Sequence, residues 1–312
     1  MNQQIAPDVR EAAASTASIA IARMPACPAC GSRHWRDAHL TIDRQHPLAH
    51  CGDCGLGALA IAGGDSREFD EYWTPVNLRI YAEPAVAGEL GHKYESYFKR
   101  VLAEVPNKRF LDVGSGAGIS IGAAAKLGFA AMGVEPSAHA VELSRRTFNV
   151  PVTQGLLHQE DALPRDYGML ALWDVIEHVT DPEDLLRACH AHLASHGVLL
   201  LETPDESALL RRMVAFVGKS GVPFLDFRKS IYYRAHRFYF SRRAMQRLLE
   251  RCGYSNIRFF AEHTMFEKEI RKKQLYGQVS AWKVPLLKLV FAVLHRLPVL
   301  ANKMVVIGTK SS

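Results

Sequence analysis

From Lys108 onward the chain alternates short apolar runs with helix-forming segments, and this alternation constrains the fold more than any other feature. Strands are predicted at "RFLDVG", "AAMGVEP", "MLALWDV" and "VLLLET", and "KMVVIGTK" is expected to be the last strand. Helices are predicted between them, including one that ends at Gly128 and one that runs from Asp181 to Gly197. Such alternation predicts an α/β domain with a mostly parallel sheet and helices on both faces.

A glycine-rich loop follows the first predicted strand, in "LDVGSGAG". Its glycines are spaced GxGxG, whereas the dinucleotide fingerprint is GxGxxG, so a nicotinamide cofactor is disfavoured. Asp112 precedes the glycines and would repel a phosphate, while Glu135 ends the next strand and can accept both hydroxyls of a ribose. S-adenosylmethionine (SAM) carries a ribose, an ammonium and a positive sulfonium, and these groups suit both acids.

The motifs "FLDVGSGAGIS", "GVEPS", "LWDVIEHVTDPEDLL" and "GVLLLETPD" resemble the successive motifs of class I SAM-dependent methyltransferases. The resemblance covers roughly residues 108–262 and implies a Rossmann-like fold with SAM as cofactor. It implies an adenine contact within 154–162, where Leu156 and Asp161 are both candidates. The other cofactor contacts that it implies are Asp112, Gly114, Ser115 and Gly116 along the methionine end, Glu135 on the ribose, and Trp173 and Asp174 on the floor.

Two CxxC pairs, with twenty residues between them, precede this domain. Thiolates in this pattern predict a tetrahedral zinc site, formed by Cys27, Cys30, Cys51 and Cys54. Disulfides are disfavoured because nothing marks the chain as secreted. The ribbon is only mildly basic and poor in aromatic residues, which favours a structural clip over a nucleic-acid-binding ribbon. More loosely, a zinc ribbon before such a domain is similar to methyltransferases of bacterial polysaccharide and natural-product gene clusters.

An acid-histidine cluster follows the strand "MLALWDV". His178, or the distant His236, is a candidate general base that takes the proton from an acceptor hydroxyl. Alternatively, Asp174, Glu177 and His178, with His236, hold a divalent metal, as the resemblance implies for family members with an acid-x-x-Glu-His motif. Asp174 stands where those members have a longer glutamate, and a third interpretation is that Glu177 and His178 only stabilise the loop.

Two segments of the catalytic domain are candidates for contact with the acceptor. The segment 204–240 is basic and aromatic, is long for a connection, and is expected to be a substrate lid that suits an anionic or sugar-bearing acceptor. Helical spacing over 282–298 predicts an amphipathic helix that packs on the domain or lies on a membrane surface. The expected divisions are a flexible N-terminus (1–24), the zinc ribbon (25–60), an aromatic linker with a cap helix (61–107) and the methyltransferase domain (108–312).

The composition permits several partners and demands none. The formal net charge is +6, which is mild, and no stretch has the length and apolarity of a transmembrane helix, so a cytoplasmic enzyme is expected. The favoured function is SAM-dependent O-methylation of a hydroxyl on a sugar, glycolipid or small metabolite. The alternatives are an RNA methyltransferase and a zinc-ribbon binding protein whose SAM domain is catalytically idle.

Overall fold

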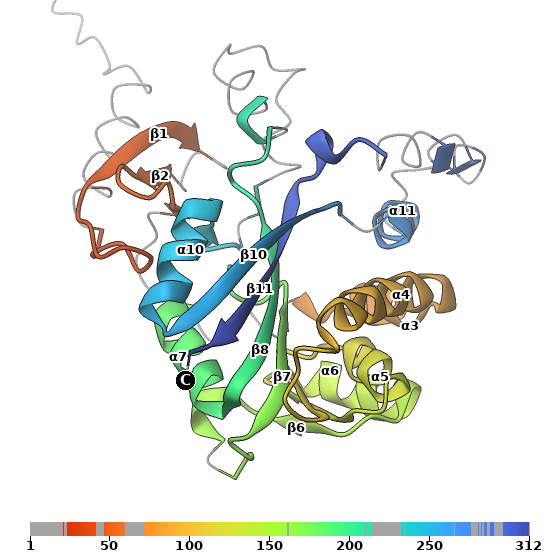
Figure 1. Ribbon diagram of the computed structural model, residues 1–312. Helices are drawn as coiled ribbons and strands as arrows, with labels where there is room; N and C mark the ends of the chain where they lie inside the picture. Colours follow the sequence, from red (N-terminus) through yellow and green to blue (C-terminus); the bar gives the residue numbers. More distant parts are fainter. Residues whose placement is uncertain are drawn as a thin grey trace, which may run out of the picture.

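Seven strands form one sheet within the described part of the chain, in the order β10-β11-β8-β7-β4-β5-β6 (Figure 1). Six of them run in the same direction, and β11 is antiparallel to both of its neighbours, β10 and β8. Its strands are β4 (Arg109–Val113), β5 (Ala130–Glu135), β6 (Val152–Gln154), β7 (Tyr167–Trp173), β8 (Leu193–Pro204), β10 (Tyr254–Glu262) and β11 (Lys303–Lys310). This computed structural model describes residues 21, 24–41, 47–59, 72–160, 162–209, 211–213, 232–233, 235–264, 266–275, 280, 282, 284–285, 288–289 and 296–311. The predicted α/β fold with a mostly parallel sheet is confirmed.

Helices cover both faces of the sheet (Figure 1). On one face, Phe98 of α4 and Ala124 of α5 pack with Phe110 of β4 in one buried cluster. On the other face, helices α7 and α10 pack against the strands through residues such as Leu186 and Leu248. The helices are α3 (Pro75–Ala82), α4 (Pro84–Val101), α5 (Ile119–Lys126), α6 (Ala138–Leu143), α7 (Pro182–His192), α10 (Arg242–Arg251) and α11 (Phe266–Leu275).

Helix α7 begins where the sequence predicts but ends earlier. The Asp181 side chain caps it by accepting a hydrogen bond from the Asp184 amide. The helix ends at His192, and Gly197, which we expected to terminate it, lies within β8. At its end, Lys310 of β11 donates hydrogen bonds to the carbonyl oxygens of His190 and Leu193. Lys310 thus satisfies carbonyl groups there, and this contact comes from a residue distant in sequence.

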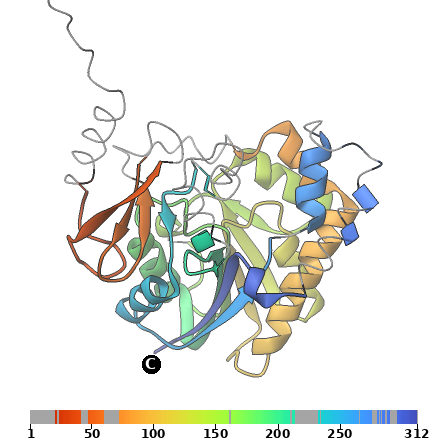
Figure 2. The same ribbon diagram turned by 90° about the horizontal axis from the view of Figure 1, so that it is seen from above.

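A second, four-stranded sheet has the order β1-β2-β3-β9. Its first three strands, β1 (Trp35–Thr41), β2 (Pro47–Cys51) and β3 (Gly57–Leu59), come from the four-cysteine segment. The fourth, β9 (Phe238–Tyr239), comes from the chain between β8 and α10 and pairs with β3. The module therefore lies beside α10, as both views show (Figure 1 and Figure 2). Strands β1 and β2, in the region between the two CxxC pairs, are paired antiparallel.

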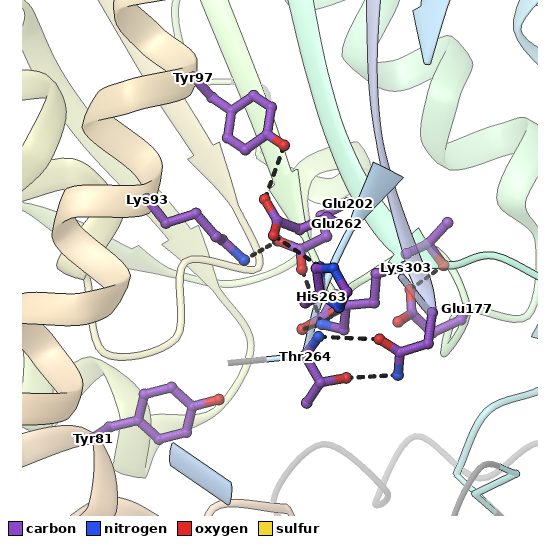
Figure 3. Close-up of polar contacts among 12 residues, drawn as sticks. Tyr81, Lys93, Tyr97, Glu177, Glu202, Glu262, His263, Thr264 and Lys303 are labelled. Carbon is purple, nitrogen blue, oxygen red and sulfur yellow. Dashed lines mark hydrogen bonds and ion pairs between the residues drawn. The ribbon is translucent and has the colours of Figure 1, made fainter. Parts of the chain in front are cut away.

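Four buried or half-buried charged side chains form a network where the parallel strands of the main sheet end: Lys93 of α4, Asp174, Glu202 and Lys303. Figure 3 labels Lys93, Glu202 and Lys303. The Lys303 ammonium lies 2.5 and 2.6 Å from the two Asp174 carboxylate oxygens and 3.0 Å from a Glu202 oxygen. Lys93 of α4 pairs with the other oxygen of Glu202. Glu202 is only 1% exposed, so both of its oxygens depend on these lysines for compensation.

Several expectations fall largely outside the described residues. Of the N-terminus 1–24 only residues 21 and 24 are described, and most of the amphipathic segment 282–298 and the central part of the lid 204–240 are not. Within the described residues, no helix combines the length and apolarity needed to cross a bilayer. Two further cysteines, Cys189 and Cys252, are buried in the core.

We predict that Lys303→Met lowers the free energy of unfolding by about 3 kcal/mol, because it leaves buried carboxylates without their cation. Urea denaturation of the full chain measures this. Lys310→Met, at the other end of β11, removes hydrogen bonds to neutral carbonyls only and should cost about 1 kcal/mol. Equal losses in the two variants would contradict this account of the charge network.

Candidate active site

One cavity of about 780 Å³ opens where the parallel strands end, which is where open α/β sheets bind ligands. It brings together residues that the sequence separates by more than a hundred positions. The predicted cofactor and catalytic residues that line it are Asp112, Gly114, Ser115, Gly116, Glu135, Trp173, Asp174, His178 and His236.

The glycine loop after β4 is shaped by two close contacts. Gly114 and Gly116 both have positive φ angles, of 68° and 51°, which side chains other than glycine rarely adopt. A Cβ atom on Gly114 would lie 2.6 Å from a methyl group of Val175, and one on Gly116 would lie 2.8 Å from the Trp73 ring. Trp73, from the aromatic linker, therefore packs directly on the loop and helps to form the cavity wall.

Two buried acids lie at the loop end of the cavity. Glu135 accepts hydrogen bonds from the amides of Gly116, at 2.8 Å, and Ser137, at 3.0 Å. The Asp112 side chain is buried, and its Oδ1 has no hydrogen-bond partner among the described residues. Burial, reinforced by Glu135, raises the pKa of Asp112 well above its ordinary range. A ligand that brings a donor or a positive charge would satisfy this carboxyl group.

Aromatic side chains form the wall beside these acids. The Tyr94 ring lies 4.4 Å from the Trp173 ring, and the Trp173 indole donates a hydrogen bond to the Ser120 hydroxyl at 3.1 Å. Tyr94 belongs to α4, so the predicted cap helix contributes to the cavity. Of the two adenine candidates, Leu156 lines the cavity and Asp161 lies outside the described residues.

The two candidate histidines are adjacent in space although 58 positions separate them (236 minus 178). Their rings lie 4.6 Å apart in an edge-to-face arrangement. The Nδ1 of His178 lies 2.9 Å from the carbonyl oxygen of Ala235, and because a carbonyl only accepts, Nδ1 carries the proton. In the neutral ring the other nitrogen, Nε2, is then free of a proton. Burial, together with the charge of His178, lowers the pKa of His236 well below its ordinary value.

Glu177 joins the histidines, whereas Asp174 turns away from them. A ligand atom from each of Glu177, His178 and His236 lies within 4.8 Å of the others, and Asp174 is not in this group. Burial, with the charge of Asp174, raises the pKa of Glu177 to about 8. Its Oε2 accepts a hydrogen bond from the Thr203 hydroxyl, and its Oε1 has no partner among the described residues.

Lys303 explains the position of Asp174. Although burial alone would raise the pKa of Asp174, the positive charge of Lys303 holds that pKa well below its ordinary value. Of the four residues suggested as metal ligands, the structure groups Glu177, His178 and His236, and Asp174 is left out because it pairs with Lys303. Sequence reasoning also missed Lys93, Glu202 and Lys303. For Glu202 and Lys303 the sequence did contain a signal, because each is a charged residue at one end of an apolar strand, "VLLLET" or "KMVVIGTK".

Three basic side chains also line the cavity. They are Lys268 and Lys272, one turn apart on α11, and Arg211. Their ammonium groups lie 5.0 Å from the Tyr81 ring and 5.7 Å from the Tyr233 ring, respectively. The nearby phenols of Tyr72 and Tyr81 and the charge of Asp174 raise the pKa of Lys268 well above its ordinary value, despite its burial.

The four cysteines form a separate cluster outside the cavity. All four Sγ atoms lie within 4.8 Å of one another, and the Cys27–Cys54 and Cys30–Cys51 pairs are both 3.6 Å apart. A disulfide would require about 2.05 Å. Zinc with four thiolates at about 2.3 Å gives sulfur–sulfur edges of about 3.8 Å, so the observed separations fit a small zinc site.

A known protein family matches the part of the chain that contributes most of the residues lining the cavity. A family model described as "Methyltransferase domain" matches residues 86–258. The matched residues include the glycine loop, Glu135, the Asp174–His178 turn and β9, but not the four cysteines or Lys303.

Curated relatives match a shorter segment. The ubiquinone biosynthesis O-methyltransferase of Schizosaccharomyces pombe is 30% identical over 111 residues, which make up 33% of this chain and 40% of that protein. The enzyme of the same name from Caulobacter sp. strain K31 is 34% identical over 103 residues, or 30% of this chain and 40% of that protein. The chain thus spans less than half the length of these relatives.

Solved structures of methyltransferases are similar in fold. A SAM-dependent methyltransferase from Archaeoglobus fulgidus has a TM-score of 0.47 and 15% identity, covering 70% of this chain and 94% of that one. Phosphoethanolamine N-methyltransferase 2 from Haemonchus contortus, in complex with SAM, has a TM-score of 0.48 and 16% identity, covering 82% of this chain and 62% of that one.

We predict that Glu135→Ala weakens SAM binding by about 10- to 100-fold, because a buried carboxylate that can bind two hydroxyls is lost. Isothermal titration calorimetry measures the affinity, and thermal unfolding checks that the variant is folded. Glu142→Ala removes an exposed glutamate from nearby α6 and should leave the affinity unchanged. Wild-type affinity in Glu135→Ala would refute the ribose assignment.

Proposed function

The chain belongs to the SAM-dependent methyltransferase family, and on this premise we propose that it transfers the methyl group to a hydroxyl of a small-molecule, sugar or glycolipid acceptor. One observation carries the proposal: a single cavity joins the acid-lined end, at Asp112 and Glu135, to the histidine pair His178 and His236. The O-methyltransferase names of the partial relatives agree with a hydroxyl acceptor.

We assign the acid-lined end to SAM, which supplies a methyl group already activated on a sulfonium. Asp112 would receive the ammonium, because its buried Oδ1 has no partner among the described residues. Glu135 would exchange its backbone hydrogen bonds for the ribose hydroxyls, and Gly114 to Gly116 would lie along the methionine. Leu156 would contact the adenine, since it lines the cavity beyond β6.

We assign the acceptor to the histidine end. His178 would take the hydroxyl proton on Nε2, since Nδ1 is occupied by its bond to Ala235. His236 would orient the hydroxyl, and its lowered pKa keeps its ring neutral near pH 7. Because the methyl group is already activated, most of the rate enhancement would come from alignment of the acceptor with it.

A divalent ion at Glu177, His178 and His236 is the alternative way to activate the hydroxyl. The unpaired Oε1 of Glu177 and Nδ1 of His236 favour it, because both are buried ligand atoms without a partner among the described residues. Activity that is lost with a chelator and restored by Mg²⁺ would support the ion. Activity that survives chelation would support the general base.

The basic residues of the cavity wall suggest the charge of the acceptor. Lys268, Lys272 and Arg211 would bind a carboxylate or phosphate substituent. An acceptor with a sugar phosphate or an aromatic carboxylate has this chemistry. Incubation of the purified protein with labelled SAM and fractionated cell extract tests the whole proposal. Label in anionic small molecules supports it, and label confined to RNA or absent from all fractions contradicts it.

We propose zinc for the Cys27, Cys30, Cys51 and Cys54 cluster, with a structural role, because no described residue of 24–59 lines the cavity. About one equivalent of zinc per chain is expected from elemental analysis, and none in a variant without the cysteines.

We predict that His178→Ala lowers kcat by about 100- to 1000-fold, because the proton acceptor is lost while the SAM end is unchanged. SAM affinity should stay within about twofold of the wild type. The assay uses labelled SAM with the acceptor fraction, and His139→Ala, an exposed histidine of α6, is the matched control. Comparable loss in both variants would exclude His178 as the base.

A further inference from the structure

The four-cysteine module is tied to the catalytic domain at both of its CxxC turns. From α10, Arg251 donates a hydrogen bond to the carbonyl oxygen of Pro28, which lies between the first two cysteines. In the second turn, the Arg247 side chain donates to the Asp53 carbonyl oxygen and Ser241 donates to that of Cys54, at 2.7 Å. Ser241 also caps α10, so the second turn and the helix start share one hydroxyl.

A backbone route leads from this module to the candidate histidine. In the β3–β9 pair, Gly57 opposes Tyr239, and the Leu59 amide donates to the Arg237 carbonyl oxygen at 3.0 Å. On the other side, the amides of Arg237 and Phe238 donate to the carbonyl oxygen of Glu177, at 2.8 and 3.1 Å. The residue next to Arg237 is His236, so this short segment is held between β3 and the Glu177 turn.

A side-chain route leads from β2 to Arg211 in the cavity wall. His50 Nε2 lies 3.0 Å from Oε1 of Glu206, and the other carboxylate oxygen of Glu206 lies 3.2 Å from the Arg211 guanidinium. Tyr232 donates a hydrogen bond to the same glutamate at 2.9 Å. Arg211 lines the cavity, although its side chain is almost fully buried.

We propose that metal binding at the four cysteines positions the acceptor side of the active site and leaves the SAM side independent. The ordered module supports β3, which fixes the segment of His236, and supports β2, whose His50 orients Arg211 through Glu206. Ser241 and His50 are therefore positioning residues. The inference rests on the proposed function, which assigns metal to the cysteines and the acceptor to the histidine end.

Among the described residues, no hydrogen bond joins the module to Asp112 or to the glycine loop, although both lie beside the same apolar core. Asp112, Glu135 and the glycine loop are held by contacts with one another, with Val175 and with the aromatic linker residue Trp73. Loss of the cysteine-bound metal should therefore affect the two sides of the cavity differently. The SAM contacts should persist, while the 235–241 segment should lose its support.

Hydrogen–deuterium exchange on the full-length protein tests this without an acceptor. We expect removal of the metal by a chelator, with excess Mg²⁺ present to keep any ion at the Glu177 turn, to speed exchange of the Arg237 and Phe238 amides by about tenfold or more. The SAM affinity, measured by calorimetry, should stay within about twofold. Unchanged exchange over 235–241, or a matching collapse of SAM affinity, would overturn the proposal.

A second variant acts on the same route and keeps the cysteines. A Cβ atom on Gly57 would lie 3.1 Å from the Tyr239 Cβ and 3.2 Å from His50 Nε2. The Gly57→Val side chain should therefore displace both the β3–β9 pair and the His50–Glu206 contact. We expect full metal content, wild-type SAM affinity and faster exchange over 235–241. Arg33→Ala, an exposed change in the same module, should leave exchange there unaltered. Wild-type exchange in Gly57→Val with the metal retained would also refute the coupling.

The two levels of proposal fail differently. Untreated protein that binds no SAM would contradict the proposed function itself. Protein that binds SAM but carries no metal as purified, or whose 235–241 segment ignores the metal, would contradict only the positioning role.

Discussion

The architecture of the site depends on one buried cation, the ammonium of Lys303. Because β11 runs antiparallel to β8, the first residue of β11, Lys303, lies beside the carboxyl ends of β7 and β8. There Lys303 meets the carboxylates of Asp174 and Glu202, and Lys93 of α4 completes the compensation of Glu202. Two acids at the ends of neighbouring parallel strands would repel each other without these lysines. The positions of Asp174 and Lys303 in the cavity wall therefore depend on these ion pairs.

The same pairing divides the electrostatics of the cavity. Asp174 is neutralised by Lys303, so the acidic character concentrates at Asp112 and Glu135 on the loop end. Lys268 and Lys272 of α11 line the same cavity, and Asp174 acts electrostatically on Lys268 as well as on Lys303. In the function that we propose, SAM lies at the acids of the glycine loop and the acceptor lies at the histidine pair.

Features that depend on residues close together in the sequence could be predicted, whereas features that depend on distant residues could not. The start of α7 was predictable because Asp181 caps a helix that begins at the next residue. The end of α7 at His192 was not, because buried Leu193 starts β8 and Lys310, distant in sequence, binds the last carbonyl groups. Likewise the order of Asp174 and Glu177 in the sequence suggested a shared metal site. Lys303, on a strand far along the chain, holds Asp174 elsewhere.

The sequence by itself determined the alternating α/β fold, the acids and glycines that flank the first two strands, and the cysteine pairs. Each of these depends on residue type and on spacing within a few positions, which periodicity and turn chemistry encode directly. Only the tertiary structure decided that His236 meets His178, that β9 completes the sheet of the four-cysteine module, and that Lys303 neutralises Asp174. These contacts join segments far apart in the chain. Their free energy comes from burial and charge pairing that exist only once the sheets have assembled.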